Sequence, residues 1–205
     1  MTNHTNQVEL WGTPEDTPIF SHENHGQRFY QFYLLVPRLS GQTDRLPVLL
    51  NQALLDQVEP GRPVRLQGQL RSFNNKSGQG NRLVLTVLAR SLTPGDGQCR
   101  NEIRLSGVIC KPPVLRRTPL GRSICDIMLA VGRRYGRADY LPVIAWGQLA
   151  LQAGELAVGT PLSLEGRFQS RLYTKLTENG PQERTAYEVS VMHLLEDEQE
   201  NSAEG

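Results

Sequence analysis

Two aromatic side chains in the second half of the chain are spaced so that they can act on the same molecule. Tyr140 and Trp146 are six residues apart in the segment 139–146, which is expected to be a strand. Successive side chains of a strand point to opposite faces, so both rings are expected on one face, while Leu141, Val143 and Ala145 occupy the other. Two open rings on one face can stack nucleobases, a contact that tolerates any base sequence.

Basic residues accompany these rings. The segment 161–173 places Arg167, Arg171 and Tyr173 on one face, and the loop 132–138 adds three arginines around Tyr135. Guanidinium groups can track the phosphates of a strand whose bases are stacked. The candidate stacking residues are Tyr135, Tyr140, Trp146 and Tyr173. The candidate phosphate-binding residues are Arg104, Arg116, Arg117, Arg122, Arg133, Arg134, Arg137, Arg167, Arg171 and Lys175. The alternative, in which the rings belong to the core and the arginines to a solvated surface, stays open from composition alone.

The elements that hold these residues occur twice. With a shift of 95 residues the chain matches itself without a gap from Val8 to Leu50, and with three more residues inserted the match resumes. Gly12, Asp44 and Leu46 recur as Gly107, Asp139 and Leu141, and Gly68 and Ser72 recur as Gly166 and Ser170. The chain is therefore predicted to consist of two copies of one domain, residues 1–95 and 99–195, joined by a short linker rich in glycine and followed by a tail, 196–205.

Each copy has short alternating segments bounded by glycine and proline, which predicts an all-β fold with one brief helix. The expected strands are 7–12, 27–37, 44–50, 62–73 and 82–92 in the first copy, and 101–109, 122–132, 139–146, 161–173 and 184–194 in the second. A helix is expected at 52–57 and again at 148–153, between the third and fourth strands. This is the element order of the OB-fold, a five-stranded Greek-key barrel, so two tandem OB-folds are predicted. Glycines inside the strand patterns, such as Gly68 and Gly166, fit bulges where a barrel curls.

Composition and charge narrow the class of protein. No apolar run is long enough to span a membrane, and the polar N-terminus does not have the pattern of a secretory signal, so a cytoplasmic, nucleoid-associated protein is expected. The three cysteines form no CxxC pair and indicate reduced thiols.

The charge is divided unevenly along the chain. Residues 1–98 hold 9 basic and 8 acidic side chains, residues 99–195 hold 13 and 8, and the last ten residues hold 5 acidic and no basic ones. The second copy is therefore basic, and the tail is acidic and expected to be disordered.

The second copy resembles the bacterial single-stranded DNA-binding protein family. The resemblance lies in NEIRLSGV (101–108), RRTPLG (116–121), IMLAV (127–131), YLPVIAWGQLA (140–150) and LEGRFQSRLY (164–173). It implies that Tyr135, Tyr140, Trp146 and Tyr173 are the stacking positions, all four of which are aromatic here. It also implies an assembly of four OB domains around which DNA wraps, which two chains of this kind would supply as a homodimer. The implied role is protection of single strands in replication, recombination and repair.

The first copy departs from this pattern. Ser40, Arg45 and Asn51 stand where the second copy has Tyr135, Tyr140 and Trp146. The first copy is therefore expected to complete the assembly and to add secondary contacts. The expected secondary contact residues are Arg65, Arg71, Phe73 and Lys76. Phe29, Tyr30, Phe32 and Tyr33 are expected mainly in the core and at interfaces, with base stacking by another route as the alternative.

Other functions find less support in the sequence. The tail has no apolar, phenylalanine-bearing tip such as the family uses to recruit replication and repair proteins, which argues against recruitment by this tail. His22 and His25 have no nearby cysteine to complete a zinc set, and no catalytic motif occurs, so no metal, no cofactor and no enzymatic activity are expected. RNA stays an alternative ligand, since stacking and phosphate contacts do not exclude a ribose hydroxyl. The main rival function is a protein-interaction scaffold resembling primosomal replication protein N.

Overall fold

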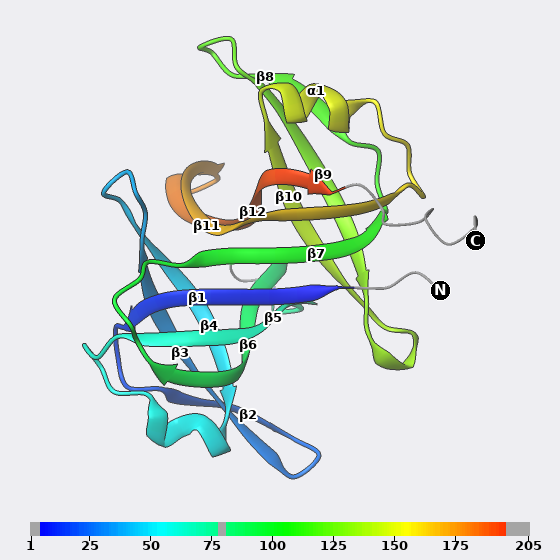
Figure 1. Ribbon diagram of the computed structural model, residues 1–205. Coiled ribbons are helices and arrows are strands. Elements are labelled where there is room, and N and C mark those ends of the chain that lie inside the picture. The colour runs from blue at the N-terminus through cyan, green and yellow to red at the C-terminus, as the bar shows by residue number, and fades with distance from the viewer. Residues whose placement is uncertain (1–4, 78–80, 196–205) are drawn as a thin grey trace.

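The computed structural model describes residues 5–77 and 81–195, whose strands form two barrels joined edge to edge (Figure 1). The first barrel contains β1 (Asn6–Pro14), β2 (Ile19–Asn24), β3 (Gln27–Pro37), β4 (Thr43–Asn51), the 3₁₀ helix η1 (Gln52–Gln57), β5 (Val64–Asn74) and β6 (Leu83–Pro94). The second barrel contains β7 (Asn101–Ile109), β8 (Val114–Arg117), β9 (Ser123–Gly132), the 3₁₀ turn η2 (Arg134–Gly136), β10 (Ala138–Trp146), α1 (Gln148–Gly154), β11 (Pro161–Thr177) and β12 (Gly180–Leu195).

Both barrels close in the same way. In the first, β1 pairs with β3 and with β5, and β4 runs parallel to β6; in the second, β7 pairs with β9 and with β11, and β10 runs parallel to β12. This is the predicted tandem OB-fold, and the all-β prediction is confirmed. The structure adds one short strand to each barrel that the sequence did not predict, β2 and β8. The predicted first helix is a 3₁₀ helix, a form common in short connectors, with Asn51 as its N-cap.

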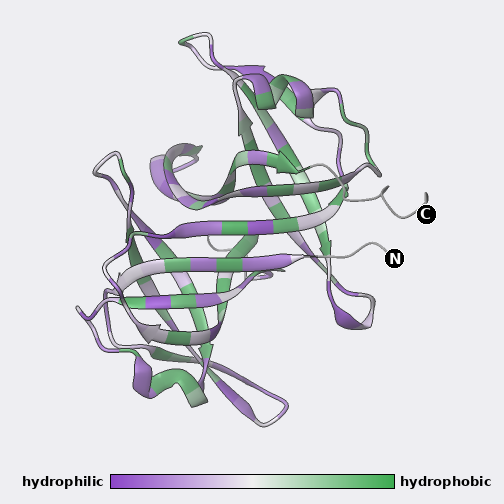
Figure 2. Ribbon diagram, viewed as in Figure 1, coloured by the Kyte–Doolittle hydropathy of each residue, from purple (hydrophilic) through white to green (hydrophobic). Residues whose placement is uncertain are grey.

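The two barrels are joined by an antiparallel pairing of β1 with β7. Asn6 pairs with Leu105, Val8 with Ile103 and Leu10 with Asn101. Since Asn6, Val8 and Leu10 correspond to Asn101, Ile103 and Leu105 in the sequence repeat, the junction has a local two-fold symmetry. Hydropathy alternates along the strands, as the bands in Figure 2 show. The inward-facing residues form a buried cluster around Leu10, Leu66, Leu105 and Phe168.

Two glycines let the strands bend. The ladders shift register between Gln67 and Gly68 and between Glu165 and Gly166. A Cβ at Gly68 would overlap the carbonyl oxygen of Leu88, and one at Gly166 would overlap that of Ser190. The predicted bulges are confirmed at both positions, and glycine is required there because a neighbouring backbone occupies the place of the side chain.

Among residues 5–77 and 81–195, no helix has the length and apolar character needed to cross a bilayer. The predicted acidic tail, 196–205, lies outside the described residues. The segment in which the sequence places the linker lies between β6, which ends at Pro94, and β7, which begins at Asn101.

Candidate nucleic-acid interface

Strand β10 separates the predicted rings from the core. Leu141, Val143 and Ala145 are buried, whereas Tyr140 is 50% exposed and Trp146 is partly exposed. Ile144 shares the outer face with the two rings by alternation but is buried, so this face is not open along its whole length. The two rings are six residues apart, which corresponds to about 20 Å along a strand. They could contact bases that are several nucleotides apart.

Trp146 is the last residue of β10, directly before the turn into α1, and Arg122 lies beside its ring. The guanidinium carbon of Arg122 lies 5.5 Å from the centroid of the Trp146 ring. On neighbouring β8, Arg116 donates a hydrogen bond of 2.6 Å from Nε to the carboxylate of Asp126. Trp146 and Arg122 therefore place a ring and a cation side by side, whereas the charge of Arg116 is partly neutralised by Asp126.

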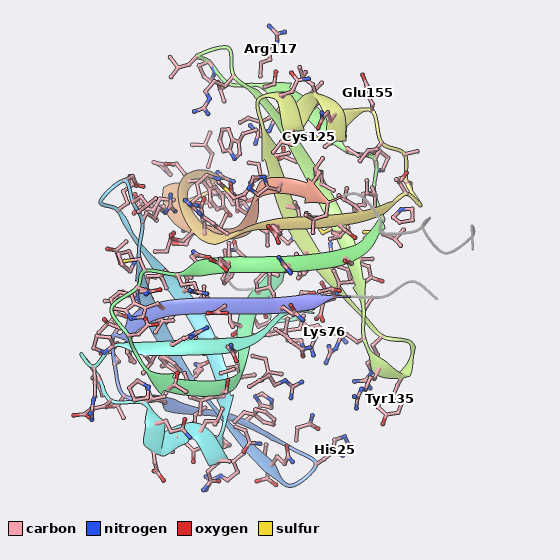
Figure 3. The ribbon with its side chains drawn as sticks, in the orientation of Figure 1. His25, Lys76, Arg117, Cys125, Tyr135 and Glu155 are labelled. Atoms are coloured by element: carbon pink, nitrogen blue, oxygen red, sulfur yellow. The ribbon has the colours of Figure 1, made fainter. Side chains whose placement is uncertain are left out.

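Tyr135 projects from the loop between β9 and β10. It has a φ of 63°, and its side chain is 96% exposed. In Figure 3 it lies at the tip of this loop, on the same side of the view as Lys76 and His25 of the first barrel. A left-handed backbone at a non-glycine residue is strained and occurs often at functional positions. The ring is therefore available to a ligand, with Arg134 and Arg137 exposed beside it.

Tyr173 lies on the long β11–β12 hairpin and reaches the first barrel. Its hydroxyl donates a hydrogen bond of 3.1 Å to Oδ1 of Asn81. The guanidinium carbon of Arg171 lies 5.9 Å from the ring centroid, and Arg171 also pairs with Glu188 at 3.1 Å. Tyr173 is partly exposed. Its position therefore depends on the other barrel.

The predicted cations fall into two groups. Arg104 and Arg167 line a groove of about 820 Å³ over the β1–β7 junction, and none of the four predicted rings lines it. Arg104 pairs with Glu165 in that groove. The second group belongs to the loops and strands that carry the rings or adjoin them, with Arg117 labelled in Figure 3 at the far end of the second barrel. This second group consists of Arg116, Arg117, Arg122, Arg133, Arg134, Arg137, Arg171 and Lys175.

The secondary contacts predicted in the first barrel have different surroundings. Arg65 pairs with Glu9 at 2.5 Å, and Arg71 pairs with Asp139 of the second barrel at 2.8 Å. Phe73 is 53% exposed, and Lys76 is exposed. The two arginines therefore already have carboxylate partners, while Phe73 and Lys76 are open to solvent.

The three departures of the first barrel also have local roles. The guanidinium carbon of Arg45 lies 3.4 Å from the centroid of the Tyr33 ring, and its Nε donates to Glu15 at 2.6 Å. Asn51 accepts a hydrogen bond from the amide of Ala53 at the start of η1. Ser40 is exposed in the loop between β3 and β4.

Sequence reasoning missed a set of polar contacts between the barrels. The carboxylate of buried Asp139 accepts hydrogen bonds from the amide of Ser72 (2.9 Å) and from Arg71. The carboxylate of buried Asp44 accepts hydrogen bonds from the amide (2.8 Å) and hydroxyl (2.9 Å) of Ser170. The signal was present, since both the aspartates and the serines recur in the sequence repeat.

The fold and the placement of the rings define a class: a protein of two tandem OB barrels with open aromatic and basic side chains on the second. Residues 100–195 match the model of the single-strand binding protein family, and this domain belongs to that family. A single-stranded DNA-binding protein from Thermus thermophilus is 30% identical over 172 residues, covering 74% of this chain and 62% of that protein. One from Neisseria meningitidis is 33% identical over 113 residues, covering 50% of this chain and 63% of the relative.

A solved structure matches the complete architecture. The crystal structure of a deletion mutant of the single-stranded DNA binding protein from Thermus aquaticus superimposes with a TM-score of 0.72 at 25% identity, covering 100% of both chains. The tandem arrangement of this chain is thus that of the Thermus proteins. The chain spans about three fifths of the length of the curated relatives just named.

Proposed function

We propose that this protein binds single-stranded DNA without preference for sequence and protects exposed strands in replication, recombination and repair. The observation that carries the proposal is the outer face of the second barrel, where Tyr135 and Tyr140 are open to solvent and Arg122 lies over Trp146. Stacked bases and neutralised phosphates together account for tight binding that tolerates any sequence. The relatives named as single-stranded DNA-binding proteins support the same ligand.

The test is fluorescence anisotropy of a labelled oligothymidine at two salt concentrations. Trp146→Ala and Tyr173→Ala are each expected to weaken binding about fivefold or more, since a stacked base contributes roughly 1 to 3 kcal/mol. Phe20→Ala is the matched control, because this ring is 49% exposed but lies on the first barrel. Wild-type affinity should fall as salt rises. Unchanged affinity in both ring variants would refute the stacking assignment.

The same experiment separates the rival functions. The four rings offer no contact that selects the sugar, so binding to RNA has to be measured separately. An oligouridine of the same length, compared with the oligothymidine, makes this measurement. A protein-interaction scaffold predicts weak binding to every oligonucleotide and no difference between Trp146→Ala and the Phe20→Ala control.

We further propose a homodimer, which would bring four barrels together from two chains. The two-fold relation at the β1–β7 junction supports this, since the chain already contains the paired barrels that such an assembly needs. Light scattering after size exclusion should give twice the 23.0 kDa mass of the chain. A mass of one chain at micromolar concentration would contradict the dimer.

A further inference from the structure

The sequence repeat places the same arginine and aspartate in both barrels, but only one of the two pairs is close. Arg38 and Asp44 of the first copy recur as Arg133 and Asp139. Arg38 donates hydrogen bonds to both carboxylate oxygens of Asp44, from Nε at 2.7 Å and from Nη2 at 2.5 Å. Nη1 of Arg133 lies 3.6 Å from the carboxylate of Asp139, which is beyond hydrogen-bond distance. Arg133 is therefore held less tightly than its counterpart.

The backbone at the two arginines does not explain this difference. The amide of Arg38 donates to the carbonyl oxygen of Gln42, and the amide of Arg133 donates to that of Arg137, each at 2.7 Å. Gln42 and Arg137 also correspond in the repeat. Since the two turns are closed by the same hydrogen bond, the difference has to come from the other groups that contact Asp139.

The close partner of Asp139 is Arg71, which belongs to β5 of the first barrel. Its Nη1 donates a hydrogen bond of 2.8 Å to Asp139, and its Nη2 donates one of 2.5 Å to the side chain of Gln69. The side chain of Arg71 is 15% exposed, compared with 34% for Arg133. The second copy has Gln169 at the position that corresponds to Arg71, so the repeat supplies this cross-barrel arginine on one side only.

One close arginine is enough to compensate Asp139. This aspartate is fully buried, and a buried carboxylate is costly unless a cation and hydrogen bonds accompany it. Arg71 and the amide of Ser72 provide both. Because the charges of Asp139 and Arg71 cancel, their combined attraction for Arg133 is weak. Arg133, two residues before the exposed Tyr135, can then direct its charge to a phosphate beside that ring.

We propose that Arg71 is a positioning residue for single-strand binding, which neutralises Asp139 across the barrel junction and so leaves Arg133 available to a phosphate. The inference rests on the proposed function. It gives Arg71 an indirect role in place of the direct secondary contact that the sequence predicted. Without Arg71, Arg133 is expected to move onto Asp139 as Arg38 does onto Asp44, and to withdraw from the DNA.

The test is the salt dependence of oligothymidine binding, measured by fluorescence anisotropy. Each phosphate contact to a single strand contributes about 0.7 to the slope of log K against log salt concentration. Arg71→Gln and Arg133→Ala are each expected to lower the slope by about this amount, and the double variant by no more than either one alone. Arg62→Gln is the control, because Arg62 is an exposed cation of the first barrel that pairs with Glu59. It should leave the slope unchanged.

Two further variants separate the charge of Arg71 from its packing. Arg71→Lys keeps a cation beside Asp139, so the wild-type slope is expected. Arg71→Gln combined with Asp139→Asn removes both charges of the buried pair, which leaves no carboxylate to attract Arg133. The slope is therefore expected to return to the wild-type value in this double variant, although the contact of Arg71 is lost. Both variants avoid an uncompensated buried charge, so they test the proposal even if Arg71→Gln alone does not fold.

The alternatives give different results. Additive losses of slope in Arg71→Gln and Arg133→Ala would show that Arg71 contacts a phosphate itself, and would overturn the proposal. An unchanged slope in Arg133→Ala, or a lowered slope in the neutral double variant, would overturn it as well. These results leave the proposed function intact. Wild-type protein that binds oligothymidine without salt dependence, or not at all, would instead overturn the proposed function.

Discussion

The hydroxyl oxygen of Ser72 in the first barrel accepts a hydrogen bond of 2.7 Å from the backbone amide of Tyr140 in the second. The residue before Tyr140, Asp139, accepts a hydrogen bond from the amide of the same serine. One residue of the first barrel thus contacts two consecutive residues of β10, one of which bears a candidate stacking ring. The barrel that has Ser40, Arg45 and Asn51 at the repeat positions of Tyr135, Tyr140 and Trp146 therefore helps to place a ring of the other barrel.

This relation has a counterpart on the other side of the junction. Ser170 of the second barrel donates to Asp44 of the first through both its amide and its hydroxyl. Arg38 adds a hydrogen bond to the same carboxylate and another to the backbone oxygen of Ser170. Each barrel thus inserts a serine beside a buried aspartate of its neighbour, and the two barrels are held as one unit by reciprocal contacts.

Ser72→Ala is expected to weaken binding of oligothymidine modestly, by about two- to fivefold, because the Tyr140 amide loses its partner. Unfolding free energy should fall by about 1 kcal/mol, the typical contribution of one hydrogen bond. Anisotropy and urea denaturation measure the two effects. Ser77→Ala is the control, since Ser77 follows Ser72 by five residues, is exposed, and donates a hydrogen bond from its hydroxyl to Asn75. Equal affinities of the two variants would contradict a positioning role for Ser72.

Asp139→Asn and Asp44→Asn test the buried carboxylates. Both aspartates are fully buried, and each pairs with an arginine that is itself mostly buried, Arg71 or Arg38. Removing one charge of such a pair leaves the other uncompensated, so each variant is expected to lose about 3 kcal/mol of unfolding free energy. Asp126→Asn, which breaks the exposed pair with Arg116, should cost about 1 kcal/mol or less. Urea denaturation compares the three variants. Equal losses of unfolding free energy would show that the buried pairs stabilise the protein no more than the exposed pair does.

How far the sequence predicted this arrangement depends on the kind of contact. Alternation along 139–146 separated Tyr140 from Leu141, because the side-chain period of a strand is set locally. The repeat identified the glycines of the bulges and the order of the long strands. It did not reveal that Ser72 contacts Asp139, since the pairing of two barrels depends on their relative orientation. Strand β2 was missed because its residues are mostly exposed and show no alternation.

Tyr187 gives a prediction for high pH. The pKa of this phenol is raised to about 12, chiefly by burial; nearby Tyr33 and Asp44 also act to raise it, and Arg45 acts to lower it. Because the folded state favours the neutral phenol, its contribution to stability is present below the ordinary pKa of 10 and is lost as pH rises from there through about 12. Tyr187→Phe should therefore lose less unfolding free energy than wild type between those two values. Urea denaturation at each pH measures it, and parallel pH profiles of the two proteins would refute the assignment.

Gly166→Ala should destabilise the second barrel, because the new Cβ would overlap the carbonyl oxygen of Ser190 on β12. Backbone cannot move aside as a side chain can, so the bulge would have to open, at a cost of about 1 to 3 kcal/mol. Gly154→Ala is the matched control: its Cβ would lie 3.3 Å from the Cβ of Leu115, which requires a shift of only a few tenths of an ångström, and a helix favours alanine over glycine. Thermal unfolding should therefore show a clear loss for Gly166→Ala only. A neutral Gly166→Ala would mean that the bulge has room for a side chain and that the repeat keeps glycine there for another reason.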